Sequence, residues 1–226
     1  MTIGRREFLL KGAAAAVGTA FAGPSLANPN NFNFRVPPSA QRAPAQARHT
    51  LNSAPAGVDP ALFQRAKAAL DQHAASIRHR DWIGIVDFNR HSGEERCQLV
   101  HLPSGTVESF RTTHGRGSDR NHNGFLDKFS NRPGSLATSN GAYVIANKYH
   151  GKYGLSQRMH GLDWSNSNAH ARAIVMHHAW YAEPEVVAQQ GKMGRSEGCF
   201  AFSKRDHWHV MNRLSDGHLL YADKRA

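Results

Sequence analysis

The chain has 226 residues, of which 40% are hydrophobic and 20% are charged, and this composition suits one globular domain with a tail. Its formal net charge is +11 at pH 7, but no run of Lys and Arg is interleaved with aromatic residues, so we expect no nucleic-acid partner. Beyond the N-terminus no apolar run is long enough to cross a bilayer, so we expect no stable membrane span. The sequence does not indicate an oligomeric state.

Residues 1–27 resemble a bacterial export signal, with a charged start, a short apolar stretch and small residues up to Ala27. Arg5-Arg6 followed by Phe8-Leu9 is similar to a twin-arginine signal, which delivers folded proteins to the periplasm. An N-terminal membrane anchor is the alternative, but the apolar stretch is short and rich in Gly, which favours cleavage after Ala27. In the cell envelope the remaining positive charge would suit anionic polymers, although it serves solubility equally well.

Residues 28–58 are rich in Pro, Ala, Asn and Gln and lack hydrophobic periodicity, which predicts a disordered linker. The domain is then expected over residues 59–226. Asp59-Pro60 is typical of a helix start, because Asp caps the first backbone N–H groups and Pro has a preset φ. Helical spacing of apolar residues extends this helix to about Ile77, with the apolar positions Leu62, Phe63, Ala66, Ala69 and Leu70.

From Asp81 onward the period becomes that of strands, and the first three segments predict a meander. A loop rich in Gly, Asn and Asp follows over residues 115–134, and a short helix precedes the last strand. These elements predict a mainly β domain with a few short helices. The strand segments are "DWIGIVDF", "RCQLVHL", "TVESFRTT", "TSNGAYVIANKY", "ARAIVMHHAWY" and "GHLLYAD", and the helix is "KRDHWHVMNRLS".

Part of the long loop has the spacing of a calcium-binding loop of the EF-hand type. The ligand-like positions are Asp119, Asn121, Asn123, Gly124 and Asp127. However, Ser130 stands where a bidentate Glu is normal, and only two carboxylates are present. We therefore favour a polar surface loop over a calcium site between Asp119 and Asp127.

The stretch "GRSEGCFAF" contains Cys199, one of only two cysteines. A cysteine acts as a nucleophile only as a thiolate, so it needs a base or a positive charge nearby. His177 and His178 lie 22 and 21 residues upstream, an order that differs from the cysteine-first order of papain-like peptidases. Gly198 would let backbone N–H groups approach a substrate carbonyl and form an oxyanion hole.

Neighbouring polar residues have possible roles as well. Arg195 has the chemistry to lower the thiol pKa or to hold a carboxylate, and Ser196 to orient either group. Two other interpretations of Cys199 stay open, namely a small core residue and a disulfide with Cys97. A metal site built from the 15 histidines is not expected, because the close pairs are badly placed to share a metal and HExxH is absent.

Together these motifs resemble the L,D-transpeptidase (YkuD-like) catalytic domain, in the branch called the murein L,D-transpeptidase catalytic domain. The resemblance rests on "GRSEGC" behind "IVMHHAWY", and on "TSNGAYVI", "FSNRPGS", "KYHGKYGLS" and "GLDWSNSNAHARAIVMH". It covers roughly Asp81 to the C-terminus. It implies a mainly β, sandwich-like fold with the active site in a cleft, and an acyl transfer in the periplasm that uses no metal or cofactor.

The resemblance also implies roles for particular residues. Cys199 matches the nucleophile that attacks a peptidoglycan tetrapeptide stem and forms a thioester, and Gly198 matches the glycine of the oxyanion region. His177 matches the family histidine, while His178 replaces the small residue beside it, which leaves the choice between the two open. Glu197 stands where many relatives have His, and its role is undetermined. Arg195 and Ser196 match the branch's "GRS" and are expected to bind substrate or support the site; His160 and His114 are expected to line the cleft.

The acyl acceptor is not fixed by the motifs. A second stem, an envelope lipoprotein or water would each resolve the thioester, so an L,D-carboxypeptidase is one alternative. A non-catalytic peptidoglycan-binding module, with Cys199 buried or bonded to Cys97, is another.

Overall fold

The computed structural model describes residues 51–225, so the predicted signal peptide and the predicted linker up to residue 50 lie outside the described residues. The α-helices are α1 (Pro60–Gln72), α2 (Pro184–Gln190) and α3 (Lys204–Arg213), and two short 3-10 helices are η1 (Trp164–Asn166) and η2 (Trp180–Ala182). The strands are β1 (Trp82–Asp87), β2 (Cys97–His101), β3 (Val107–Phe110), β4 (Gly141–Gly151), β5 (Gly154–Gly161), β6 (Val175–His178), β7 (Phe200–Phe202) and β8 (Leu219–Asp223).

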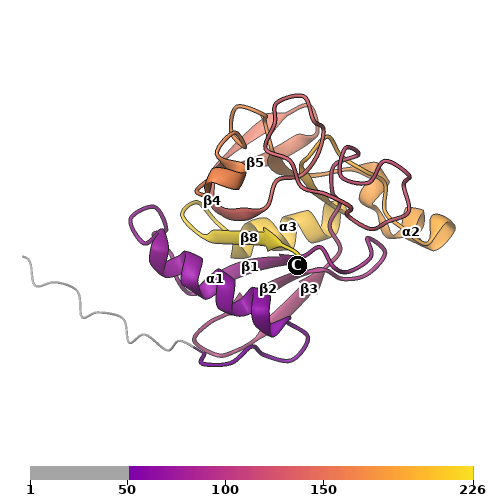
Figure 1. The fold of residues 1–226 in the computed structure, drawn as a ribbon. Coiled ribbons are helices and arrows are strands. Elements are labelled where there is room, and N and C mark those ends of the chain that lie inside the picture. The colour runs from indigo at the N-terminus through magenta and orange to yellow at the C-terminus, as the bar shows by residue number, and fades with distance from the viewer. Residues whose placement is uncertain (1–50, 226) are drawn as a thin grey trace, which may run out of the picture. The chain divides into compact units, whose positions relative to one another are not determined.

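Within residues 51–225 the eight strands form one mixed sheet in the order β3-β2-β1-β8-β4-β5-β6-β7 (Figure 1), which confirms the mainly β fold with few short helices. The first three strands are the predicted antiparallel meander. The C-terminal strand β8 runs parallel to β1 and antiparallel to β4, so it joins the meander to the other strands. At the far edge β6 and β7 are parallel, which brings the chain after His177 back beside it.

Helices cover the sheet on both faces because the strands of its centre are apolar on both sides. The helix α1 buries Leu62 and Phe63 against Ile83 and Ile85 of β1. On the opposite face α3 contributes to a second cluster that includes Phe200 of β7. In Figure 1, α1 and α3 lie on different sides of the central strands.

The helix α1 begins where the sequence predicted, but it ends earlier than predicted. The Asp59 carboxylate accepts hydrogen bonds from the N–H groups of Ala61 and Leu62, at 2.9 and 3.0 Å. The helix ends at Gln72 instead of about Ile77, and His73 bonds to Asp163 at 2.8 Å. Ile77 is still buried, but it reaches the core from a non-helical segment, which is why apolar spacing alone extended the helix too far.

Residues 51–58, at the end of the predicted linker, pack against the domain. Val58 is buried in the cluster under α1, and Leu51 and Ala54 pack against the same cluster. The Lys67 ammonium also donates a hydrogen bond to the Leu51 carbonyl at 2.5 Å. The ordered structure therefore begins before Asp59.

Besides the two 3-10 helices, three elements were not predicted, namely β5, β7 and α2. The strand β5 buries Ser156 and Gln157, so it lacks an alternating apolar pattern that would mark it as a strand. The strand β7 has only three residues, and α2 has only seven, which is too short for a periodic signal. None of the helices in residues 51–225 combines the length and apolar character needed to cross a membrane.

Candidate active site

Cys199 lies at the entry to β7, next to the strand that carries His177. Met176 is paired with Phe200 and His177 with Ala201 in the parallel ladder, so Cys199 lies beside Val175 at the start of β6. Cys199 and His177 line one cavity of about 260 Å³. Other side chains of its wall come from β4, β5 and the segments that flank β6 and β7: Tyr149, Lys152, Tyr153, Ser156, Arg172 and Tyr181.

The His177 ring is held in one tautomer. Its Nδ1 lies 2.9 Å from the carbonyl oxygen of His178, and since a carbonyl only accepts, Nδ1 must carry the proton. Nε2 is then the basic nitrogen, because a neutral imidazole has one donor and one acceptor. Burial lowers the pKa of His177 below its ordinary value, so the ring is neutral at pH 7. His177 is thus held as a neutral base.

Tyr153 fixes the plane of that ring. The Tyr153 and His177 rings stack with their centroids 4.3 Å apart and an angle of 18° between their planes. Tyr153 itself is 39% exposed, so it forms an outer layer over the buried imidazole. Neither the stacking nor Tyr153 was expected from the sequence.

His178 lies on the other side of the strand, because neighbouring strand residues point to opposite faces. Its ring is 6.0 Å from that of His207, and it does not line the cavity of Cys199. The structure therefore brings His177, and not His178, together with the cysteine.

Cys199 is half-buried and protonated in this structure. Its Sγ lies 3.4 Å from the carbonyl oxygen of Ala173, a contact that a thiol makes as a donor. The pKa of the thiol is raised to about 11, chiefly by burial and in part by the Glu197 carboxylate. The Val175 N–H and the Arg172 guanidinium act in the opposite direction. The resting pair is therefore a neutral thiol with a neutral imidazole.

We expect the alkylation rate of Cys199 by iodoacetamide to rise with pH up to about pH 11, because the thiolate fraction increases until the pKa is reached. Glu197→Gln removes a negative charge and should increase the rate at pH 8 by about two- to threefold, a small factor because Glu197 is largely exposed. Peptide mass spectrometry measures the rate at this site. Glu185→Gln, an acid on α2, is the matched control. A rate already constant between pH 7 and 9 would contradict the neutral thiol.

The loop before Cys199 is shaped by its own side chains. The Ser196 hydroxyl donates to the Cys199 carbonyl at 2.7 Å and accepts from the Gly198 N–H at 3.2 Å. Thr138 donates to the Gly198 carbonyl at 3.2 Å. Among residues 51–225 the Cys199 N–H has no acceptor, so it is the backbone donor that is available to an oxyanion. Ser196 therefore shapes the loop, and the Gly198 N–H is already engaged.

Gly198 is required by both its backbone and its surroundings. Its φ is +121°, and a Cβ added there would lie 2.9 Å from the Ala137 carbonyl oxygen. We expect Gly198→Ala to destabilise the protein by about 1–3 kcal/mol and to slow Cys199 alkylation by displacing the loop. Gly134→Ala is the control, because its φ is +73° but its Cβ would meet nothing within 4 Å. Urea unfolding gives both stabilities; equal losses would show that only the backbone conformation matters.

The positive charge of Arg172 acts on the Cys199 thiol and lowers its pKa, and the sequence interpretation did not single this residue out. Its guanidinium donates hydrogen bonds to the Ser130 carbonyl at 2.6 Å, to the Ser135 hydroxyl at 3.1 Å and to the Ala137 carbonyl. It lines the cavity of Cys199. A usable sequence signal was present, since this arginine stands shortly before the strand that carries His177.

Of the other residues singled out from the sequence, Glu197 lines the cavity, whereas Arg195 and His160 lie outside its wall. The Arg195 guanidinium is held by the backbone carbonyls of Asp119 and Arg120. Glu197 lines the cavity, and its carboxylate is paired with Arg116 at 2.7 Å. His160 stacks on His170 with ring centroids 4.6 Å apart and is not in the cavity wall.

His114 is part of a buried polar cluster behind the loop that precedes Cys199. Arg96 donates to its Nδ1 at 2.8 Å, and its Nε2 therefore donates to the Asp119 carboxylate at 3.2 Å. Burial and the charge of Arg96 lower the pKa of His114 to about 3, so the ring is neutral. The His114 carbonyl accepts from the Ser196 N–H at 2.9 Å, which ties this cluster to the loop of Cys199. His114 does not line the cavity.

The loop with calcium-like spacing is held by protein contacts. The Asp119 carboxylate accepts from the N–H groups of Asn123 and Gly124, both at 3.0 Å, as well as from His114. Asp119 is fully buried, so this part of the loop is not a surface feature. In the part of the chain that the structure describes, no three His, Cys, Asp or Glu side chains are grouped to hold a metal ion.

The disulfide interpretation is wrong. Both cysteines are free, and Cys97 is buried in the core beside Phe110 on β3, away from the cavity of Cys199. Burial raises the pKa of the Cys97 thiol to about 12, so it is inert at neutral pH.

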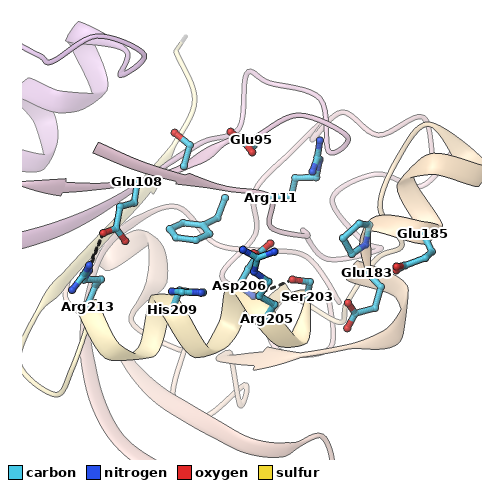
Figure 2. Close-up of a pocket in the computed structure, with 13 residues that line it drawn as sticks. Glu95, Glu108, Arg111, Glu183, Glu185, Ser203, Arg205, Asp206, His209 and Arg213 are labelled. Atoms are coloured by element: carbon cyan, nitrogen blue, oxygen red, sulfur yellow. Dashed lines mark hydrogen bonds and ion pairs between the residues drawn. The ribbon is translucent and has the colours of Figure 1, made fainter. Parts of the chain in front are cut away.

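A larger cavity, of about 780 Å³, lies elsewhere on the domain (Figure 2). It lies between β3 and the start of α3 and contains neither Cys199 nor His177. Its charged side chains largely serve the fold: Glu108 pairs with Arg213 at 2.8 Å, and Ser203 caps α3 by accepting from the Asp206 N–H at 3.0 Å. The larger cavity therefore lacks the cysteine–histidine pair that defines the candidate site.

Comparison with known proteins agrees with the geometry. The family model described as the L,D-transpeptidase catalytic domain matches residues 54–222. The chain belongs to this family. L,D-transpeptidases are enzymes. No curated protein matches the sequence.

Solved structures similar to this L,D-transpeptidase domain are distant. An L,D-transpeptidase from Mycobacterium smegmatis is 13% identical, with a TM-score of 0.38 over 63% of this chain and 58% of that one. L,D-transpeptidase 3 from Mycobacterium tuberculosis is 13% identical, with a TM-score of 0.41 over 63% and 61%. An L,D-transpeptidase from Xylanimonas cellulosilytica is 12% identical, with a TM-score of 0.38 over 70% and 68%. The chain thus spans about three fifths of the first two structures.

Proposed function

We propose that this protein is an exported L,D-transpeptidase that transfers an acyl group from a peptidoglycan tetrapeptide stem through a thioester on Cys199. The observation that carries the proposal is the shared cavity of Cys199 and His177, with Nε2 of His177 left as a base by the hydrogen bond at Nδ1. The family match to residues 54–222 supports the same chemistry.

In the first half-reaction His177 Nε2 takes the thiol proton as Sγ attacks the carbonyl carbon of the third stem residue. The Cys199 N–H stabilises the oxyanion. When the tetrahedral intermediate collapses, His177 returns the proton to the amine of the leaving D-alanine. In the second half-reaction an acceptor amine loses a proton to His177 as it attacks the thioester carbonyl. When the C–S bond breaks, His177 gives this proton to the departing Sγ, which restores the neutral thiol and imidazole.

A neutral pair suits this sequence of steps. A free thiolate in the resting protein would be open to oxidation in the periplasm, whereas a thiol with a pKa of about 11 is protected until a substrate is bound. When the substrate displaces water from the cavity, its scissile carbonyl lies beside Sγ of Cys199 and Nε2 of His177. The proton moves only when it contributes to bond formation.

The test is to incubate the purified protein with tetrapeptide muropeptides and to analyse products by chromatography and mass spectrometry. Release of D-alanine with formation of 3→3 cross-linked dimers supports the proposal. Release of D-alanine with tripeptides alone identifies an L,D-carboxypeptidase, and binding without release identifies a non-catalytic module; either result overturns the transpeptidase assignment.

A further inference from the structure

A second cavity adjoins the catalytic loop and has a cationic wall. It measures about 450 Å³ and is lined by residues of the 117–137 segment, including Arg120, Lys128 and Arg132. No carboxylate lines this cavity. None of the three cations is in an ion pair with another residue of the 51–225 range. Three unpaired positive charges around one cavity are a site for an anionic group.

The two cavities meet at Arg172. Its guanidinium lines the cavity of Cys199, and it binds Ser130, Ser135 and Ala137, which all line the cationic cavity. The carbonyl of Ala137 is also the atom closest to the position that a Cβ on Gly198 would take, at 2.9 Å. A molecule in the cationic cavity is therefore close to the backbone of the residue before the nucleophile.

The charges of the two cavities differ. The cavity of Cys199 contains the Glu197 carboxylate together with Lys152 and Arg172, whereas the cationic cavity contains no negative group. A mixed wall suits a zwitterionic stem residue, while a purely cationic wall suits a carboxylate. The acceptor has to approach a thioester on Cys199 from a neighbouring space, and a cationic space beside Gly198 would draw in an anionic acceptor.

We propose that the cationic cavity binds a carboxylate of the acyl acceptor, which makes an anionic peptide stem the second substrate. This proposal rests on the proposed function, because it assigns the acceptor of the same reaction. The cations orient the acceptor by its carboxylate and leave its amine free to attack the thioester. An uncharged acceptor loses this contact and competes poorly.

The experiment measures how fast a preformed acyl-enzyme decays with two acceptors. One is a tripeptide stem with free carboxylates, and the other is the same peptide with its carboxylates amidated. Intact-protein mass spectrometry follows the Cys199 adduct, and the acceptor concentration is varied to obtain half-saturation. Lys128→Gln/Arg132→Gln is the test variant. Lys204→Gln/Arg205→Gln on α3 removes one Lys and one Arg elsewhere and is the matched control.

We expect the test variant to raise half-saturation for the carboxylate acceptor by about tenfold and to leave the amidated acceptor unchanged. The control variant should behave as the unsubstituted protein, and acylation by the donor should be the same in all three. Added salt should weaken binding of the carboxylate acceptor less in the test variant, which keeps only Arg120 of the three cations, than in the unsubstituted protein. A test variant that matches the control, or that loses both acceptors equally, overturns the proposal.

Failure of the proposed function is recognised separately, because then no acyl-enzyme forms in any variant. Calorimetric titration of the resting protein with the two tripeptides still tests the cavity. Tighter binding of the carboxylate form that disappears in the Lys128→Gln/Arg132→Gln variant supports the site. Equal binding of both forms overturns it.

Discussion

Cys199→Ala is expected to reduce D-alanine release from tetrapeptide muropeptides by on the order of 10⁴-fold or more and to abolish the covalent adduct. The reason is that Sγ is the only thiol in the cavity shared with His177. Product analysis gives the rate, and intact-protein mass spectrometry detects the adduct. Adduct and product must disappear together if the thioester lies on the pathway.

The same substitution at the other cysteine is the control for this prediction. Cys97→Ala removes a buried core atom and should cost about 1 kcal/mol of stability, yet it leaves the cavity of Cys199 intact. Circular dichroism and urea unfolding check that both variants fold. Release of D-alanine by the Cys199→Ala protein at the unsubstituted rate would refute the assigned nucleophile.

His177→Gln is expected to slow acyl-enzyme formation by about 10²- to 10⁴-fold, because general base catalysis is lost. His178→Gln is the matched control at the neighbouring position, whose ring does not line the cavity and contacts the His207 ring instead. Its rate should stay close to that of the unsubstituted protein. If the His178 variant shows the larger loss, the base has been assigned to the wrong histidine.

The pH dependence of acylation gives an independent check of His177. A protonated ring cannot accept the thiol proton, so the rate falls as the pH drops through the pKa of His177. Since burial lowers that pKa, the fall should occur below pH 6.5, the ordinary value for histidine. The His177→Gln protein should lack this limb of the profile. A fall centred above pH 7 would show that the ring is not held in an apolar environment.

The sequence correctly predicted the secondary-structure elements that depend on neighbouring residues in the chain. Asp59 and Pro60 set the start of α1 through a cap and a fixed φ, and the meander followed from alternating apolar residues. The strand β5 was missed because two of its three buried residues, Ser156 and Gln157, are polar, and β7 because three residues are too few to show a period. The parallel pairing of β8 with β1 is a contact between the two ends of the domain, which local pattern does not encode.

The candidate site was predictable where motif and chain order agree. The pairing of Cys199 with an upstream histidine followed from their order, and the family resemblance favoured His177. The choice against His178 needed the direction in which each ring points. Arg172 and Tyr153 were missed because their roles depend on tertiary contacts with residues far away in the sequence.

The buried thiol of Cys97 can serve as an intrinsic probe of unfolding, because a reagent reaches it only when the protein opens. It is 0% exposed with a pKa of about 12, while Cys199 is half-buried beside a cavity. In the folded protein an alkylating reagent should therefore add one label, and in the unfolded protein two. The fraction of doubly labelled chains then counts opened molecules, so every variant described above can be scored for folding and for nucleophile reactivity in one mass spectrum.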